Sequence, residues 1–139
     1  MIQLIIGEKG KGKTKVLLDK ANTEIKSVNG NIVYLDKSAQ HMYELNNKVR
    51  LIDVTGYPVT NSDEFLGFIC GIISQDHDLE QMYLDSFLKI ACLEGADVTA
   101  ALEKLAKISD QFSVNFIISI SLTKDQLPES MKDSIIAEL

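Results

Sequence analysis

The sequence predicts an α/β fold with three layers, in which a mostly parallel five-stranded sheet carries helices on both faces. Apolar runs of strand length alternate along the chain with longer segments of helical spacing, and this order is typical of a parallel sheet covered by helices. The chain has 139 residues, of which 45% are hydrophobic, enough for one domain with a substantial core. We therefore expect a single domain over residues 1–139.

The first half of the chain alternates strand and helix patterns. Residues 2–6 form a run of three isoleucines and a leucine interrupted only by Gln3, as expected of a central strand buried on both faces. Apolar residues at helical spacing predict a helix over 13–28, which an Asn-Gly pair ends. A second strand is expected over 32–35 and a third over 49–54. Between them, residues 38–46 read as a short helix with Ser38 as its N-cap.

The second half continues the alternation. Asn61 or Ser62 is expected to cap a helix whose buried face is apolar and whose end is marked by Asp76-His77-Asp78. A fourth strand is predicted over 82–84, a long amphipathic helix over 98–112 and a fifth strand over 114–122. A closing helix is expected after Pro128. Any site should then lie at the carboxyl ends of the strands.

Composition argues against several functional classes. The formal charge of -6 has the wrong sign for a general binder of nucleic-acid backbones, so a nucleic-acid role would need a local basic patch. Cys70 and Cys92 both lie in apolar runs, where a thiol usually behaves as a small buried hydrophobic group, so we expect a reducing, cytoplasmic setting. No apolar run has the length of a signal or membrane-spanning segment. Asp76-His77-Asp78 reads as solvated charge at a helix end, and we expect no zinc there.

One motif carries chemistry. Residues 7–14 match G-x-x-x-x-G-K-[ST] at every fixed position, directly between a buried strand and a helix, and read Gly7-Glu8-Lys9-Gly10-Lys11-Gly12-Lys13-Thr14. Such a loop points its backbone amides at phosphate groups, while the helix N-terminus adds positive charge. We expect Lys13 to contact the β and γ phosphates and Thr14 to offer its hydroxyl to Mg²⁺. Lys9, Lys11 and Lys15 either help to attract a triphosphate or are solvated charges.

With this motif the chain resembles the P-loop NTPase superfamily, and it is most similar to the RecA and KaiC-like ATPases. Further residues that carry the resemblance are Asn31-Ile-Val-Tyr-Leu-Asp36, Met82-Tyr-Leu-Asp85-Ser86 and the segments 101–106 and 114–121. The resemblance implies ATP and Mg²⁺ as ligands. It also implies that Asp85 holds a magnesium water from the strand beside the phosphate-loop strand. We further expect the chain to form a homo-oligomer or to bind a partner protein.

Two departures from the family bear on turnover. The resemblance implies a water-polarising glutamate near the end of the second strand, where this chain has Asp36-Lys37-Ser38, so Asp36 is the candidate base. The only arginine, Arg50, lies within the third strand, a poor position from which to supply charge to a neighbour's nucleotide, and Lys124 is a substitute. Ser119, Ser121 and Thr123 either sense the γ phosphate or are simply polar strand positions.

Alternative functions are open at this stage. Asp53-Val54-Thr55-Gly56 ends the third strand with the D-x-x-G of GTPases, but Thr123-Lys124-Asp125-Gln126 has glutamine where an aspartate would read guanine. A small-molecule kinase, a structural use of the loop, and a nucleotide-dependent binding module without turnover also remain. The expectation is a Mg-dependent ATP-binding protein that hydrolyses ATP slowly or serves as a subunit of a larger assembly.

Overall fold

The sheet of this protein has six parallel strands, one more than the sequence predicts. The computed structural model describes all 139 residues and orders the strands β3-β2-β4-β5-β1-β6. The strands are β1 (Ile2–Ile6), β2 (Asn31–Asp36), β3 (Val49–Asp53), β4 (Leu79–Leu84), β5 (Asn115–Ile120) and β6 (Ile135–Glu138). All five strand pairings are parallel, so the carboxyl ends of the strands meet at one edge.

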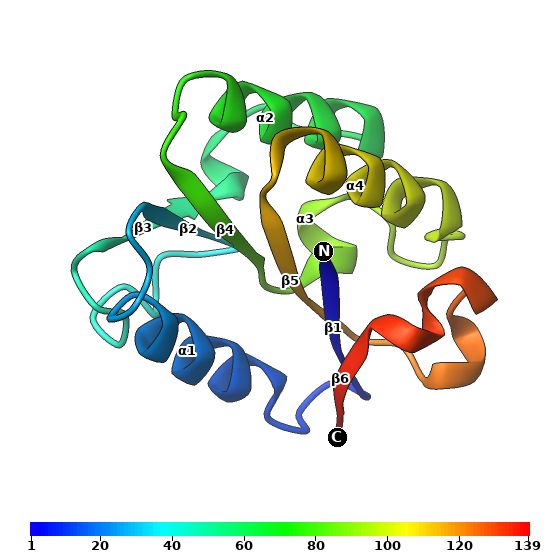
Figure 1. The fold of residues 1–139 in the computed structure, drawn as a ribbon. Helices are drawn as coiled ribbons and strands as arrows, with labels where there is room; N and C mark the ends of the chain where they lie inside the picture. The colour runs from blue at the N-terminus through cyan, green and yellow to red at the C-terminus, as the bar shows by residue number, and fades with distance from the viewer.

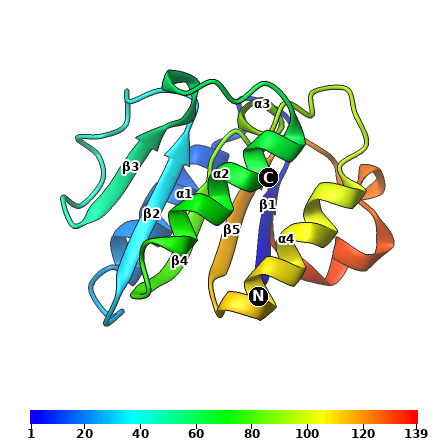
Figure 2. The same ribbon diagram turned by 90° about the horizontal axis from the view of Figure 1, so that it is seen from above.

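Helices cover both faces of the sheet, which confirms the predicted three layers. One face carries α1 (Lys13–Glu24), and the other carries α2 (Ser62–Ser74) and α4 (Thr99–Phe112), which lie side by side (Figure 1). Figure 2 shows α2 and α4 in front of the strands. Short helical segments complete the connections: α3 (Phe87–Ile90) and the 3-10 helices η1 (Val54–Gly56), η2 (Lys124–Gln126) and η3 (Glu129–Ser134).

The sheet separates two hydrophobic cores. The larger one packs β-strand side chains against α2, α3 and α4, and the smaller one packs the opposite side chains against α1. Leu4, Ile5 and Ile6 of β1 are all fully buried although they alternate between the two cores. The apolar run over residues 2–6 is therefore a central strand buried on both faces, as predicted.

The structure shows which residue caps α2, and α1 is shorter than predicted. The side chain of Asn61 accepts a hydrogen bond of 2.9 Å from the amide of Glu64, so Asn61 and not Ser62 caps α2. The first helix ends at Glu24, four residues before the predicted end. The chain then tightens into turns, but Ile25 and Val28 still pack against the smaller core, which explains why their spacing resembled a longer helix.

Residues 38–46 form consecutive turns and not the predicted helix. Leu45 is the only buried side chain of this segment, so a helix there would have no apolar face to pack. Asn22 of α1 holds the segment instead. The Asn22 amide donates to the carbonyl of Glu44 at 2.8 Å, and its oxygen accepts from the amide of Asn46 at 2.7 Å.

The predicted closing helix after Pro128 is a 3-10 helix of six residues, and the chain ends in a strand that the sequence did not predict. Met131 is the only buried residue of η3. The strand β6 pairs in parallel with the open edge of β1, and its side chains alternate between half-buried and exposed. The segment 135–138 forms a strand because it pairs with β1. Four residues are too few to show a periodic pattern from which the strand could be predicted.

The strand before Asp85 does not lie beside the phosphate-loop strand, which corrects the expectation from the resemblance. β5 pairs with β1 on one side and with β4 on the other, and so separates them. Asp85 directly follows β4 at the edge where β1 leads into the phosphate loop. A side chain of β5 must therefore connect Asp85 with the loop that follows β1.

Both cysteines depart from expectation, because Cys70 on α2 and Cys92 after α3 are exposed free thiols. Cys70 lies on the solvent side of the α2 pattern, and Cys92 lies at a positive φ of 59° in the turn that ends α3. None of the helices is both long and apolar enough to cross a membrane.

Candidate functional site

The loop between β1 and α1 offers a row of free backbone amides. None of the amides of residues 8–15 donates to a carbonyl or side chain of the protein. Gly10 and Gly12 have φ angles of 80° and 97°, in the left-handed region that strains other residues, and these angles turn the loop into the start of α1. A concave run of unpaired amides at a helix N-terminus is suited to bind an anion, above all a phosphate.

Lys13 lies at the base of this loop. Its side chain is largely buried, and its Nζ donates to the carbonyl oxygen of Glu8 at 2.8 Å. Burial lowers the pKa of Lys13, and the carboxylate of Asp85 acts in the opposite direction. The lysine ammonium is therefore held within the loop, close to a negative charge.

Asp85 is the most highly connected side chain of the site, with four hydrogen-bond donors around a carboxylate that is 1% exposed. Its Oδ1 accepts from the Thr14 hydroxyl at 3.2 Å, the Ser119 hydroxyl at 2.6 Å and the Ser86 amide at 2.9 Å. Its Oδ2 accepts from the Tyr34 hydroxyl at 2.8 Å. Burial and the nearby carboxylate raise the pKa of Tyr34 well above its usual value, so this hydroxyl remains a donor.

Ser119 explains how Asp85 reaches the phosphate loop across the intervening strand. It is a small buried residue of β5, between the strands that lead to Asp85 and to the loop. Its hydroxyl donates to Asp85 and accepts from the Ser86 amide at 3.0 Å. The bridge across β5 is thus made by one short side chain, which leaves Asp85 in contact with Thr14 at the start of α1.

A cavity of about 450 Å³ opens beside these residues. It is lined by Lys9, Gly10, Gly12, Lys13, Thr14, Lys37, Asp85, Ser86, Leu88, Lys89, Glu94, Ser119 and Ser121. Four lysines and two acidic residues face it, although the whole chain has a charge of -6. The cavity is therefore positive within an acidic protein, and Leu88 is the only hydrophobic residue among those that line it.

Sequence reasoning missed two of these lysines. Lys37 directly follows β2, so its position at the carboxyl end of a parallel strand was a usable signal. Lys89 lies on the short helix α3, which no periodicity predicted. Lys9 lines the cavity and pairs with Glu94 at 4.0 Å, but both side chains are well exposed, so the pair contributes little stability.

Asp36 lies at the end of β2 and is not among the residues that line the cavity. It is 2% exposed. Its Oδ1 accepts from the Lys37 amide at 2.7 Å, whereas its Oδ2 is buried without a hydrogen-bond partner. Burial raises the pKa of Asp36 to about 6, with a further contribution from the negative charge of Asp85. A carboxyl group that titrates near neutrality and has one free oxygen can accept a proton from water.

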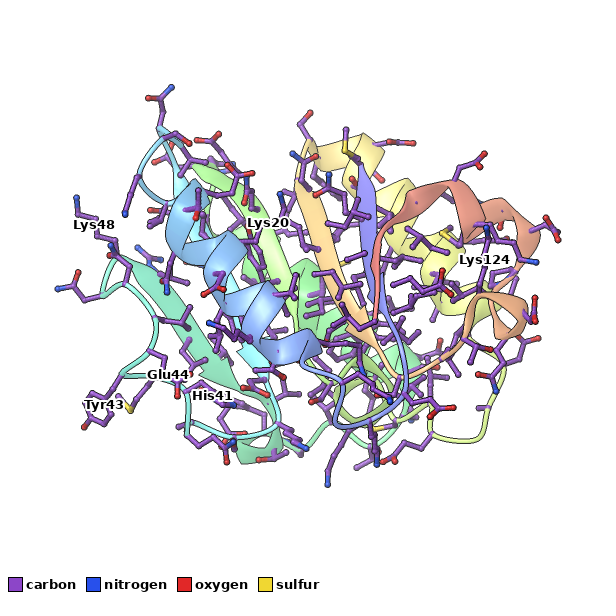
Figure 3. All side chains as sticks on the ribbon, turned by 90° about the horizontal axis from the view of Figure 1, so that it is seen from below. Lys20, His41, Tyr43, Glu44, Lys48 and Lys124 are labelled. Atoms are coloured by element: carbon purple, nitrogen blue, oxygen red, sulfur yellow. The ribbon has the colours of Figure 1, made fainter.

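Several predicted residues contribute no side chain to the cavity. Glu8 contributes its carbonyl oxygen, Lys11 does not line the cavity, and Lys15 pairs with Asp19 at 3.4 Å on α1. Of the two alternatives for Ser121 and Thr123, Ser121 lines the cavity, whereas Thr123 caps η2 with Gln126. Lys124 belongs to η2, and in Figure 3 it lies on the opposite side of the molecule from His41 and Glu44.

Arg50 is at the wrong edge of the sheet to reach the cavity. It pairs at 3.7 Å with Asp76, which also accepts hydrogen bonds from Asn31 at the amino end of β2. The side chain of Asp76 is only 7% exposed, so it joins strands and is not the solvated charge that the sequence suggested. His77 and Asp78 are exposed.

Asp53 of the D-x-x-G segment is remote from the phosphate loop. It ends the edge strand β3, and β2, β4 and β5 lie between that strand and β1. Its Oδ1 accepts from the Thr55 amide at 3.0 Å, so the carboxylate caps η1. The segment therefore has a local structural explanation that requires no ligand.

The donor set of the cavity fits a hard divalent cation. Mg²⁺ prefers oxygen ligands and keeps several waters, and Thr14 and Asp85 offer a hydroxyl and a carboxylate at one point beside the phosphate loop. No family model matches the sequence, and no curated protein is significantly similar to it.

Proposed function

We propose that this chain is a P-loop protein that binds a nucleoside triphosphate together with Mg²⁺, with ATP as the nucleotide, and hydrolyses it slowly. The observation that carries the proposal is the hydrogen bond between Thr14 and Asp85 beside the row of free amides. It brings together the three features that a magnesium-bound triphosphate needs: an anion-binding loop, a buried lysine and an oxygen ligand pair.

Each residue has a role under this proposal. The amides of residues 8–15 bind the phosphates, and Lys13 places its ammonium against them. Thr14 and Asp85 hold the cation, which when bound neutralises charge on the phosphates. Asp36 is the candidate base, because its carboxylate is free on one oxygen and its pKa is about 6; it is buried outside the cavity, so an attacking water reaches it only if the turns after β2 open.

ATP is favoured over GTP because the D-x-x-G segment has a structural role away from the loop. Asp53 caps η1 on an edge strand, and it is Asp85 that contacts Thr14. Gln126, at the position where an aspartate would read guanine, is committed to the cap of η2. Neither residue needed for a GTPase-like site is thus available near the loop.

A nucleotide-dependent binding module without turnover is the second candidate, and the position of Arg50 favours it. Arg50 pairs with Asp76 at the edge of the sheet opposite to the cavity. Positive charge supplied at the transition state accelerates such reactions by orders of magnitude, and the only arginine of this chain cannot supply it. Either form of the proposal is compatible with a homo-oligomer or with a subunit of a larger assembly that supplies the missing charge.

Calorimetric titration with ATP in the presence of Mg²⁺ tests the proposal. Wild type should bind, and Lys13→Ala should weaken binding by about 100-fold, because charge-assisted hydrogen bonds to phosphate are lost. Lys20→Ala is the matched control, since Lys20 lies on the same helix and pairs with Glu24. Equal affinities of wild type and Lys13→Ala would refute the proposal. Displacement of a bound analogue by GTP in preference to ATP would instead refute the choice of nucleotide.

A further inference from the structure

Two buried tyrosines lie side by side beneath α1. Tyr34 of β2 and Tyr83 of β4 are register partners, both are fully buried, and their rings stack with centroids 6.0 Å apart and an interplanar angle of 11°. They differ in where their hydroxyls go. Tyr34 donates to Oδ2 of Asp85 at 2.8 Å, whereas Tyr83 donates to Oε1 of Gln81 at 2.7 Å.

The Tyr34 hydroxyl is the only donor to Oδ2 of Asp85. The other three donors, from Thr14, Ser119 and Ser86, all go to Oδ1. Rotation of the carboxylate about its Cβ–Cγ bond would break contacts at both oxygens, so Tyr34 adds a restraint on Oδ2 to the three that act on Oδ1. It comes from the side of the sheet that α1 covers, where the tyrosine ring is packed among the side chains of the smaller core.

We infer that Tyr34 is a positioning residue that fixes the Asp85 carboxylate relative to Thr14 and thereby sets the Mg²⁺ affinity of the site. This inference rests on the proposed function. Outer partners that hold a metal-binding carboxylate commonly change metal affinity by about 10-fold to 100-fold when they are removed. Tyr83 has the same ring and burial and stacks on Tyr34, but its hydroxyl makes no contact with Asp85.

Tyr34→Phe and Tyr83→Phe form a matched pair of variants that tests the inference. Nucleotide affinity is measured by calorimetry across a Mg²⁺ titration and again in EDTA, on variants shown to be folded by circular dichroism. Tyr34→Phe should raise the Mg²⁺ concentration for half-maximal effect about 10-fold or more, with affinity in EDTA unchanged. Tyr83→Phe should change neither quantity by more than about two-fold.

The outcomes separate the inference from the proposed function. If wild type shows no Mg²⁺-dependent nucleotide binding, the proposed function fails. If wild type binds but the two variants shift the Mg²⁺ midpoint equally or not at all, the positioning role of Tyr34 is overturned. A loss of affinity in EDTA as large as that in Mg²⁺ would also overturn it, since it would show a general structural effect.

A measurement on wild type keeps the test valid if Tyr34→Phe does not fold. With ¹³C-labelled tyrosine, adding Mg²⁺ to the nucleotide-bound protein should shift the Cζ resonance of Tyr34, because its hydroxyl is bonded to the carboxylate that meets the cation. The Cζ resonance of Tyr83 should stay in place. Equal shifts of both resonances, or none, would contradict the inference.

Discussion

Thr14 and Asp85 are 71 positions apart in the sequence, and their side chains meet at 3.2 Å. Thr14 stands in the first turn of α1, and Asp85 directly follows a strand that does not neighbour β1. Ser119 of the intervening strand donates to the same Asp85 oxygen, so one hydroxyl from each of two elements converges on one carboxylate. Under the proposed function, this convergence is the place where Mg²⁺ would be bound.

Asp85→Asn should weaken the Mg²⁺ dependence of nucleotide binding, because the amide provides one weaker oxygen in place of a charged carboxylate. Asp53→Asn is the control, since Asp53 caps η1 on the edge strand. We expect about 10-fold or greater loss of Mg²⁺ affinity for the first variant only. The measurement is a Mg²⁺ titration of nucleotide affinity. A larger effect of Asp53→Asn would return the D-x-x-G segment to consideration.

Asp36→Asn should stabilise the protein at neutral pH. The pKa of Asp36 is raised from 3.8 to about 6, so the folded state binds this proton more tightly than the unfolded state, and stability falls as pH rises between those values. Above pH 6 the full cost is present, and it corresponds to roughly 3 kcal/mol. Besides Asp85, the groups that act on Asp36 are Lys37 and His41, which both lower its pKa.

Urea unfolding of wild type and Asp36→Asn at pH 4 and pH 7.5 checks this. The variant should gain stability relative to wild type at pH 7.5, and most of the gain should vanish at pH 4, where wild type is largely protonated. Turnover should fall in the same variant if Asp36 accepts the proton from water. An equal difference in stability at both pH values would show that the effect does not come from ionisation.

Lys37→Ala should weaken triphosphate binding about five-fold, or about 1 kcal/mol, because it removes one exposed cation from the cavity. The affinity should also become less sensitive to salt, since a screened charge has been lost. Lys124→Ala is the matched control, as Lys124 lies outside the cavity on η2. The measurement is calorimetry at two ionic strengths. Identical behaviour of both variants would remove Lys37 from the site.

The sequence was informative where a structure is determined locally. The glycine-containing loop over residues 7–12, the buried strand before it and the position of Asp85 after a strand could be predicted, because each depends on residues close together in the chain. Their roles toward nucleotide and Mg²⁺ stay predictions. Lys89 and the hydrogen bond from Tyr34 to Asp85 could not be predicted, because they depend on which strands become neighbours. The place of β5 between β1 and β4 and the pairing of β6 with β1 are likewise decided by tertiary contacts.

Two segments that were expected to be α-helices, residues 38–46 and the segment after Pro128, illustrate the same limit. Residues 38–46 contain acceptable helix formers, but only Leu45 reaches the core. The side chain of Asn22 bonds the Glu44 carbonyl and the Asn46 amide, so these backbone groups are satisfied without a helix. Propensity alone is too weak to fold such a short segment. After Pro128, the free edge of β1 offered hydrogen bonds that an isolated helix could not match.

Turnover by the isolated protein should be slow, below about 10⁻² s⁻¹, compared with about 10 s⁻¹ for typical enzymes. Arg50 is held by Asp76 at the far edge of the sheet, and Ser38 stands in the turns after β2 where a water-polarising glutamate is expected. Ser38→Glu should raise turnover, because it adds a carboxylate two residues beyond Asp36. The measurement is phosphate release from ATP under saturating Mg²⁺. A wild-type rate of about 1 s⁻¹ or more would mean that Asp36 already serves as an efficient base and that no charge from a partner is needed.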